Sequence, residues 1–327
     1  METIKLKING IEVTAPKGST ILEAARLAHI EIPTLCFLKE INEIGACRVC
    51  IVELKNGKLV TSCVYPAEDG MEVFTNTPKV MDSRKKTIQL LLSNHNRSCL
   101  SCVRSGHCEL QELARELGVE DEGYYDGETT PSEIDTSAAH MIRDNSKCIL
   151  CRRCVAVCSE VQGIGVIGAN NRGFATEIGS AFGMGLGETS CVSCGQCIAV
   201  CPTGALQEKD CTSEGFAAIA DPSKHVIVQT APAVRAALGE EFGLPIGTNV
   251  EGKMAAALRR LGFDRVFDTD FSADLTIMEE AHEFLDRVKN GGALPMITSC
   301  SPGWVKYCEH YFPDMTENLS TCKSPQQ

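Results

Sequence analysis

The chain has 327 residues, a formal net charge of -12 and 19 cysteines. The acidic balance argues against nucleic acid or an anionic membrane surface as the main partner, and no apolar run approaches the roughly 20 residues that span a bilayer. Because the amino terminus has no apolar signal core and the odd number of cysteines is spaced as in metal-binding loops, a reducing, cytoplasmic setting is favoured over a secreted disulfide scaffold.

Residues 1–78 predict a small β-grasp domain. Two strands are expected on either side of an Asn-Gly turn signal at 9–10. A helix should follow over 21–29, with Ser19 or Thr20 as its N-cap.

Four cysteines of this segment have the pattern of a 2Fe-2S site. Four thiolates with one close pair suit that cluster, although the plant-type spacing would place four residues, not ten, between the first two. Gly45 and Ala46 keep bulk away from the second cysteine, so backbone N–H groups can approach the sulfides. A structural zinc ion is the alternative. The candidate ligands are Cys36, Cys47, Cys50 and Cys63.

Residues 79–138 predict a small helical domain with a second metal site. Helices are expected over 81–92 and 109–118, and the acidic stretch 120–136 should be a linker or surface loop. Three cysteines alone could belong to a zinc site, but a histidine one helical turn before the first of them supplies a fourth donor. We interpret the site as a 4Fe-4S cluster with one imidazole ligand, for which His107 competes with His95. The candidate ligands are His95, Cys99, Cys102 and Cys108.

Residues 139–215 carry two copies of C-x2-C-x2-C-x3-C, the spacing of bacterial two-cluster ferredoxins. The first copy has Ser159 where proline is usual, and an insert over 160–190 separates the copies, but neither change removes a ligand. In such ferredoxins the fourth cysteine of each copy ligates the other cubane, which indicates electron transfer. The two expected sets are Cys148, Cys151, Cys154 and Cys201, and Cys191, Cys194, Cys197 and Cys158.

The insert contains a dinucleotide-like glycine pattern, Gly163-x-Gly165-x2-Gly168. The true motif follows a strand and opens a helix within a βαβ unit, which is not expected here. No residue is therefore assigned to nucleotide binding, and any NAD(P) or flavin should belong to another chain.

From about residue 216, alternating strands and helices predict an α/β domain. Strands are expected over 225–230 and 265–269, and helices over 233–239, 254–262 and 278–288.

The order of a 2Fe-2S site, a His-containing 4Fe-4S site and two cubanes resembles complex I's large iron–sulfur subunit and the accessory domains of iron–iron hydrogenases. The tail distinguishes them, because residues 298–304 are similar to the hydrogenase active-site motif Thr-Ser-Cys-Cys-Pro-x-Trp. Residues 274–280 and 319–327 also resemble the hydrogenase catalytic domain. The resemblance covers the whole chain, is closest to large catalytic subunits of NAD(P)-linked multisubunit hydrogenases, and favours His95 over His107.

The resemblance implies an α+β multidomain protein with a β-grasp 2Fe-2S domain, a small helical His-ligated 4Fe-4S domain, a two-cluster ferredoxin domain and an incomplete α/β catalytic domain. It implies one 2Fe-2S and three 4Fe-4S clusters, and a cytoplasmic oxidoreductase acting on H2. The implied partners are a flavin- and NAD(P)-binding iron–sulfur subunit, a small 2Fe-2S subunit and ferredoxin, with simple or bifurcating electron flow. The implied domains are 1–78, 79–138, 139–215 and 216–327.

The family's proton path, carried over by position, uses a thiol and two carboxylates, each able to take and give a proton. The alternative is that the two carboxylates lie on the solvated face of an amphipathic helix. The residues at these positions are Cys300, Glu280, Ser320, Glu283 and Arg287.

Two departures bear on catalysis. Ser301 stands where the family has a second cysteine that ligates the cubane half of the H-cluster, and serine is a poorer iron ligand. The family's later motifs, Met-Pro-Cys and Met-Ala-Cys-x-Gly-Gly-Cys, do not occur in the 327 residues. Cys211, Cys308 and Cys322 lack the spacing of a substitute site, and Cys308 is expected to be a buried helix residue.

An H-cluster is therefore expected only in a complete catalytic domain, and these 327 residues should transfer electrons without turning over hydrogen. Two alternatives remain open. One is a non-catalytic electron-transfer subunit of an NADH dehydrogenase-type complex, which should lack the 298–304 motif. The other is a redox sensor, which would carry a regulatory module.

Overall fold

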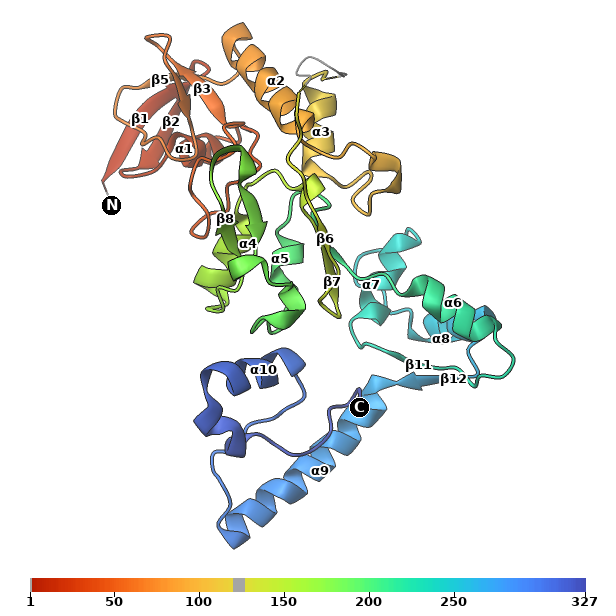
Figure 1. Ribbon diagram of the computed structural model, residues 1–327. Helices are drawn as coiled ribbons and strands as arrows, with labels where there is room; N and C mark the ends of the chain where they lie inside the picture. Colours follow the sequence, from red (N-terminus) through yellow and green to blue (C-terminus); the bar gives the residue numbers. More distant parts are fainter. Residues whose placement is uncertain (1, 120–126) are drawn as a thin grey trace. The chain divides into compact units, whose positions relative to one another are not determined.

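The computed structural model describes residues 2–119 and 127–327, and the chain forms two compact units, Met1–Lys209 and Asp210–Gln327 (Figure 1). The expected boundary near residue 216 lies a few residues beyond the start of the second unit. Within the described residues, no helix combines the length and apolar character needed to cross a membrane.

The first unit begins with a five-stranded mixed sheet in the order β2-β1-β5-β3-β4. Both residues of the expected turn, Asn9 and Gly10, have positive φ, as a two-residue hairpin requires. Helix α1 (Ile21–Leu27) buries its apolar face against this sheet. Thr20, and not Ser19, is the N-cap. The strands are β1 (Thr3–Ile8), β2 (Ile11–Pro16), β3 (Ile51–Leu54), β4 (Leu59–Thr61) and β5 (Glu72–Phe74).

Two helices, α2 (Pro78–Ser93) and α3 (Glu109–Glu116), form the next part of this unit. A short 3-10 turn, Cys99–Ser101, lies between them. His95 follows the C-cap of α2, so an irregular loop connects it to Cys99, and the expected single helical turn between them is wrong. Of the expected loop over 120–136, residues 120–126 lie outside the described residues, and the rest includes strand β6 (Ile134–Asp135).

The remainder of the first unit surrounds a three-stranded sheet, β10-β7-β6. A separate hairpin, β8 and β9, is formed by the insert, and Gly168 begins strand β8 where the nucleotide motif would begin a helix. Short 3-10 turns occupy Asn145–Lys147, Gly173–Ala175, Ala181–Gly183 and Leu186–Glu188. The other elements are β7 (Met141–Asp144), β8 (Gly168–Asn170), β9 (Glu177–Gly179), β10 (Leu206–Glu208), α4 (Arg153–Ala156), a π-helical turn (Val157–Val161) and α5 (Gln196–Ala199).

The second unit contains two parallel strands, β11 (Ile227–Thr230) and β12 (Arg265–Asp268), joined through helices α7 and α8. This is the expected alternation of strands and helices. Helix α9 begins at Thr269 and not near 278, because the Asp268 side chain accepts from the Asp270 N–H and caps it there. The helices are α6 (Thr212–Ala220), α7 (Val234–Glu241), α8 (Glu251–Leu261), α9 (Thr269–Asn290) and α10 (Pro302–Tyr311), followed by a 3-10 turn over Pro313–Asn318.

Candidate metal centres

The four cysteines predicted for the 2Fe-2S site are buried and lie in two pairs. Cys50 Sγ and Cys63 Sγ are 3.3 Å apart, and the Cys47 N–H points at Cys36 Sγ at 3.5 Å. A hydrogen bond between the thiols of each pair lowers the pKa of Cys47 to about 6 and that of Cys50 to about 7, and it raises the pKa of their partners. The two pairs lie close together, since the charges of Cys36 and Cys47 also contribute to the raised pKa of Cys63.

The loop around Cys47 turns its backbone toward the sulfurs. Gly45 and Arg48 have φ of 62° and 61°, a left-handed conformation that a residue such as arginine rarely adopts. The N–H groups of Ala46 and Cys47 both interact with the Cys36 sulfur and oppose the increase in its pKa. Strain held by the surrounding structure is typical of a ligand-binding loop.

At the second site, the three cysteines are close enough for two of them to act electrostatically on the third. The pKa of Cys108 is raised by burial and, more weakly, by the charges of Cys102 and Cys99. Burial lowers the pKa of His95, which favours the neutral imidazole that can bind a metal, while His107 is exposed. The described contacts of His95 do not join it to the three cysteines.

The loop after Cys201 packs directly against this second site. Cys108 Sγ lies 3.7 Å from the Pro202 carbonyl oxygen, and the Glu109 N–H donates to the same oxygen at 3.1 Å. A Cβ added to Gly204 would lie only 2.6 Å from Cys102 Sγ. The second site and the ferredoxin-like region are therefore in contact through a segment that tolerates only glycine at this point.

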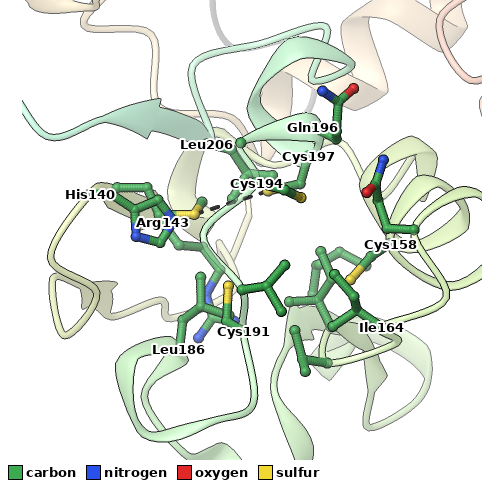
Figure 2. Close-up of a pocket in the computed structure, with 17 residues that line it drawn as sticks. His140, Arg143, Cys158, Ile164, Leu186, Cys191, Cys194, Gln196, Cys197 and Leu206 are labelled. Atoms are coloured by element: carbon green, nitrogen blue, oxygen red, sulfur yellow. Dashed lines mark hydrogen bonds between the residues drawn. The ribbon is translucent and has the colours of Figure 1, made fainter. Parts of the chain in front are cut away.

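The eight cysteines of the doubled motif line two cavities, and each cavity takes one cysteine from the other copy. Figure 2 shows the first cavity, with Cys158 on its own segment and three cysteines of the second copy around it. Burial raises the pKa of Cys148 to about 11 and of Cys151 and Cys197 to about 12. The first cavity is lined by Cys158, Cys191, Cys194 and Cys197, and the second by Cys148, Cys151, Cys154 and Cys201.

The backbone between these cysteines is repeatedly left-handed. Leu150, Arg152 and Ser193 have φ between 54° and 61°, although none is glycine, and Gly195 has φ of 72°. Each such non-glycine residue costs about 1–3 kcal/mol and persists only where the surrounding structure imposes it. The strain occurs only a residue or two from the predicted ligands.

Buried arginines supply a further sign that groups belong in these sites. Among the described residues, the Nε atoms of three such arginines, Arg84, Arg143 and Arg153, have no hydrogen-bond partner. The same is true of His95 Nδ1. An N–H left in this state costs about 1–3 kcal/mol, and thiolate and sulfide sulfurs would accept from it. The donor sets therefore fit iron–sulfur clusters. Each arginine interacts electrostatically with a predicted ligand: Arg84 with Cys50, Arg143 with Cys148 and Arg153 with Cys151.

The spacing of the predicted ligands is not that of a site for a single ion: within residues 2–119 and 127–327, no group of three or more His, Cys, Asp or Glu side chains is arranged to hold one metal ion.

In the second unit, three of the five predicted relay residues meet in one network. Glu283 on α9 accepts from Arg287 Nη2 at 2.6 Å and from Ser320 Oγ at 3.0 Å. The Thr321 N–H and Cys322 Sγ donate to the same carboxylate at 3.0 and 3.4 Å. Burial opposes its ionisation, but these donors, Arg287 foremost, lower the pKa of Glu283 to about 2. Glu283 is therefore an ionised acceptor.

The other two relay residues are not part of this network. Cys300 is exposed, and the described contacts do not join it to Glu280 or Ser320. Its neighbour Ser299 donates to the Cys322 carbonyl oxygen at 3.3 Å. Glu280 lies near the network, since its charge contributes, after burial, to the raised pKa of Cys322.

Ser301 has a local structural role. Its Oγ accepts from the Trp304 N–H at 3.5 Å and caps helix α10, with Pro302 at the first helical position. Cys308 is completely buried in the same helix, as expected, and Cys211 is exposed at the start of α6.

Sequence reasoning missed the residues that join the sites, because their roles depend on tertiary contacts. Asn42 contacts backbone beside two different sites, Arg104 Nη2 donates to the Cys201 carbonyl oxygen at 2.9 Å, and Arg153 forms two hydrogen bonds to Glu109 at 2.7 and 3.0 Å. No motif or local pattern around these residues indicates the contacts.

Four protein-family models match the chain. "Iron only hydrogenase large subunit, C-terminal domain" matches residues 224–327. "2Fe-2S iron-sulfur cluster binding domain" matches 1–78, "NADH-ubiquinone oxidoreductase-G iron-sulfur binding region" matches 84–122, and "4Fe-4S dicluster domain" matches 147–205. Domains for both cluster types are therefore present, ahead of a hydrogenase C-terminal domain.

Two curated proteins are similar to nearly the whole chain. The NADP-reducing hydrogenase subunit HndD of Solidesulfovibrio fructosivorans is 52% identical over 339 residues, which is 100% of this chain and 58% of that protein. Iron hydrogenase 1 of Clostridium pasteurianum is 41% identical over 321 residues, 98% of this chain and 56% of that protein. The chain thus spans little more than half the length of these relatives.

A solved structure is similar to the iron–sulfur part. A chain in the crystal structure of an NAD+-reducing [NiFe]-hydrogenase in the H2-reduced state is 31% identical, with a TM-score of 0.59. The similarity covers 63% of this chain and 87% of that chain.

Proposed function

The chain belongs to the family of iron-only hydrogenase large subunits, and from this membership we propose that it is the electron-transferring iron–sulfur portion of an iron–iron hydrogenase, which interconverts H2 with protons and electrons. The observation that carries the proposal is the pair of cavities, each lined by three cysteines of one copy and one of the other. This is the ligand arrangement of a two-cluster ferredoxin.

Four ligand sets are proposed, for one 2Fe-2S and three 4Fe-4S clusters. When bound, each cluster takes up and releases electrons at a potential set by its surroundings. An H-cluster is proposed only for a complete catalytic domain. The sets are Cys36, Cys47, Cys50 and Cys63; His95, Cys99, Cys102 and Cys108; Cys148, Cys151, Cys154 and Cys201; and Cys191, Cys194, Cys197 and Cys158.

The protein's part in this function is to hold the sites close together and in a fixed order. Asn42 connects the 2Fe-2S site to the site that contains Cys151. The ion pair between Arg153 and Glu109 connects that site to the segment after Cys108. Arg104 connects the second site to Cys201. These contacts connect three sites within one compact unit, as electron transfer between them requires.

In the second unit we propose a proton path through the predicted relay residues. Ser320 Oγ and Cys322 Sγ already donate to Glu283, which Arg287 holds in place. Because the pKa of Glu283 is lowered to about 2, this carboxylate accepts protons only transiently at neutral pH. Its proposed task is to orient Ser320 and Cys322.

The proposed partners supply or take electrons. One relative is named an NADP-reducing hydrogenase subunit, so a flavin-bearing NAD(P) subunit, a small 2Fe-2S subunit and ferredoxin are proposed, in the cytoplasm. The described residues around the insert contain no nucleotide loop, since Gly168 starts a strand. Whether electron flow is simple or bifurcating depends on these partners.

A second function is an electron-transfer subunit of an NADH dehydrogenase-type complex. The match of residues 84–122 to the NADH-ubiquinone oxidoreductase-G region favours it. The match of 224–327 to the hydrogenase C-terminal domain favours the hydrogenase.

The proposal is tested by following the visible absorption of the purified 327-residue chain with different electron donors. Reduced ferredoxin, or NADPH together with a flavin-bearing oxidoreductase subunit, should bleach the absorption reversibly, and NADPH alone should not. Bleaching by NADPH alone would contradict the assignment of the nucleotide site to another chain. If no donor bleaches the protein, electron transfer itself is wrong.

A further inference from the structure

Arg143 lies in the central strand of the three-stranded sheet of the first unit. In strand β7 it is directly opposite Asp135 of β6 and Leu206 of β10. Its Nη2 is 3.1 Å from Asp135 Oδ2, and the two side chains are only 11% and 12% exposed. Pairing on both sides therefore fixes the position of the guanidinium.

The partner of Arg143 is itself held firmly as an anion. Burial disfavours the charge of Asp135, but hydrogen bonds from Ser137 and from the Leu186 N–H, together with Arg143, lower its pKa. Asp135 Oδ2 accepts from the Leu186 N–H at 2.9 Å. The pair is thus a fixed cation beside a fixed anion, and Arg143, but not Asp135, lines the cavities.

Arg143 lines both of the cysteine cavities described above. In Figure 2 it is among the side chains at the wall of the cavity that contains Cys191 and Cys194. It also lines the other cavity, together with Cys148, Cys151, Cys154 and Cys201.

Two of the nitrogens of this side chain lack acceptors. Across residues 2–119 and 127–327, Nε and Nη1 of Arg143 are buried and have no hydrogen-bond partner. A buried charge with unsatisfied N–H groups is unstable unless an acceptor, preferably a negative one, is present. Among the described residues, Arg143 lines both cysteine cavities, and a cluster bound in either would supply such an acceptor.

We propose that Arg143 is a potential-setting residue shared by the two cubane sites. Its Nε and Nη1 donate to sulfurs of the bound clusters, and its charge stabilises the reduced form of each, which carries one more negative charge than the oxidised form. The inference rests on the proposed function, and it adds a residue that belongs to neither cysteine motif.

The test is an EPR-monitored redox titration of the 327-residue chain and its variants. Arg143→Gln should lower the equilibrium constant for one-electron reduction of at least one cubane tenfold, which corresponds to a decrease of about 59 mV in its potential. The 2Fe-2S potential should not change. Arg143→Lys, which keeps the charge, should recover most of the loss. Asp135→Asn should move the cubane potentials in the opposite direction, because it removes the compensating anion.

The matched control is Arg172→Gln, which removes the same charge from an exposed position of the same region and should shift nothing. Cubane potentials unchanged in Arg143→Gln, or shifted equally with the 2Fe-2S potential, would overturn the inference while leaving the proposed function intact. If Arg143→Gln fails to assemble clusters, Asp135→Asn decides: an upward shift supports the inference, and any other result contradicts it. A wild-type chain without reducible clusters would instead contradict the proposed function.

Discussion

The side-chain amide of Asn42 joins two sites that are far apart in the sequence: Nδ2 donates to the Cys36 carbonyl oxygen at 2.7 Å and to the Cys151 carbonyl oxygen at 3.0 Å. Asn42 is 3% exposed, so both bonds are shielded from water. The residue therefore fixes the 2Fe-2S region against the first run of the doubled motif.

Replacement of Asn42 by leucine should destabilise this connection. Leucine fills a similar volume but leaves two carbonyl oxygens without a donor, at a cost of about 1–3 kcal/mol for each. Asn42→Asp should destabilise more, because it places a carboxylate against both carbonyls. Urea unfolding monitored by visible absorption measures this. Asn56→Ala, at an exposed turn, is the control, and equal stabilities of the Asn42 and Asn56 variants would contradict the role of Asn42.

Gly204→Ala should damage a metal site to which Gly204 contributes no ligand. The new Cβ would lie 2.6 Å from Cys102 Sγ, so the thiol or the loop must move. We expect loss of most of one cluster, about four iron atoms, from the chain. Iron analysis and EPR of the reduced protein measure it.

Gly168→Ala is the matched control for that substitution, because a Cβ there meets no atom within 4 Å. It should keep its full iron content. If both variants keep all their iron, the contact between the Gly204 loop and the second site does not matter for assembly.

Each cavity is lined by three cysteines of one copy of the motif and one cysteine of the other copy. This arrangement predicts which cysteine variants lose the same cluster. Cys158→Ala should lose the same EPR signal as Cys197→Ala, and Cys201→Ala the same signal as Cys151→Ala, because these pairs line the same cavities. Each loss should be about four iron atoms. Cys211→Ser serves as the control. Grouping of Cys158 with Cys151 instead would show that each copy holds its own cluster.

Glu283→Gln should loosen the segment around Ser320 in the second unit. Glutamine keeps the shape but loses the charge that pairs with Arg287, which should cost about 2 kcal/mol. Hydrogen exchange of the Ser320, Thr321 and Cys322 amides should rise.

The stabilisation of the Ser320 segment by Glu283 should decrease as the pH is lowered. Since the pKa is lowered from an ordinary 4.5 to about 2, the contribution is complete above 4.5 and is lost as the pH falls toward 2. Exchange in the wild type should therefore approach that of Glu283→Gln over this range. Protection that stays constant from pH 6 to pH 2.5 would contradict the assignment.

Local signals in the sequence predicted much of this arrangement. The hairpin at 9–10, the capping of α1 by Thr20 and the alternation of strands and helices after residue 216 follow from short-range rules that the structure obeys. The cysteine spacing alone also indicated which residues gather around each of the two cavities.

What the sequence did not reveal depends on contacts between distant segments. Asn42 and Cys151 are 109 residues apart, and nothing in the local sequence around Asn42 suggests a partner there. Strand β6 is too short to be recognised within an acidic loop and exists because β7 pairs with it. The sequence analysis did not single out Arg143, because its proposed role depends on the two cavities that it lines.

The most direct test of the account is the iron, sulfide and zinc content of the purified 327-residue chain, together with EPR of the reduced protein. The account predicts about 14 iron atoms per chain, from one 2Fe-2S and three 4Fe-4S clusters, with paramagnetic signals that appear on reduction. About four zinc ions per chain, without iron and without reducible spins, would contradict it.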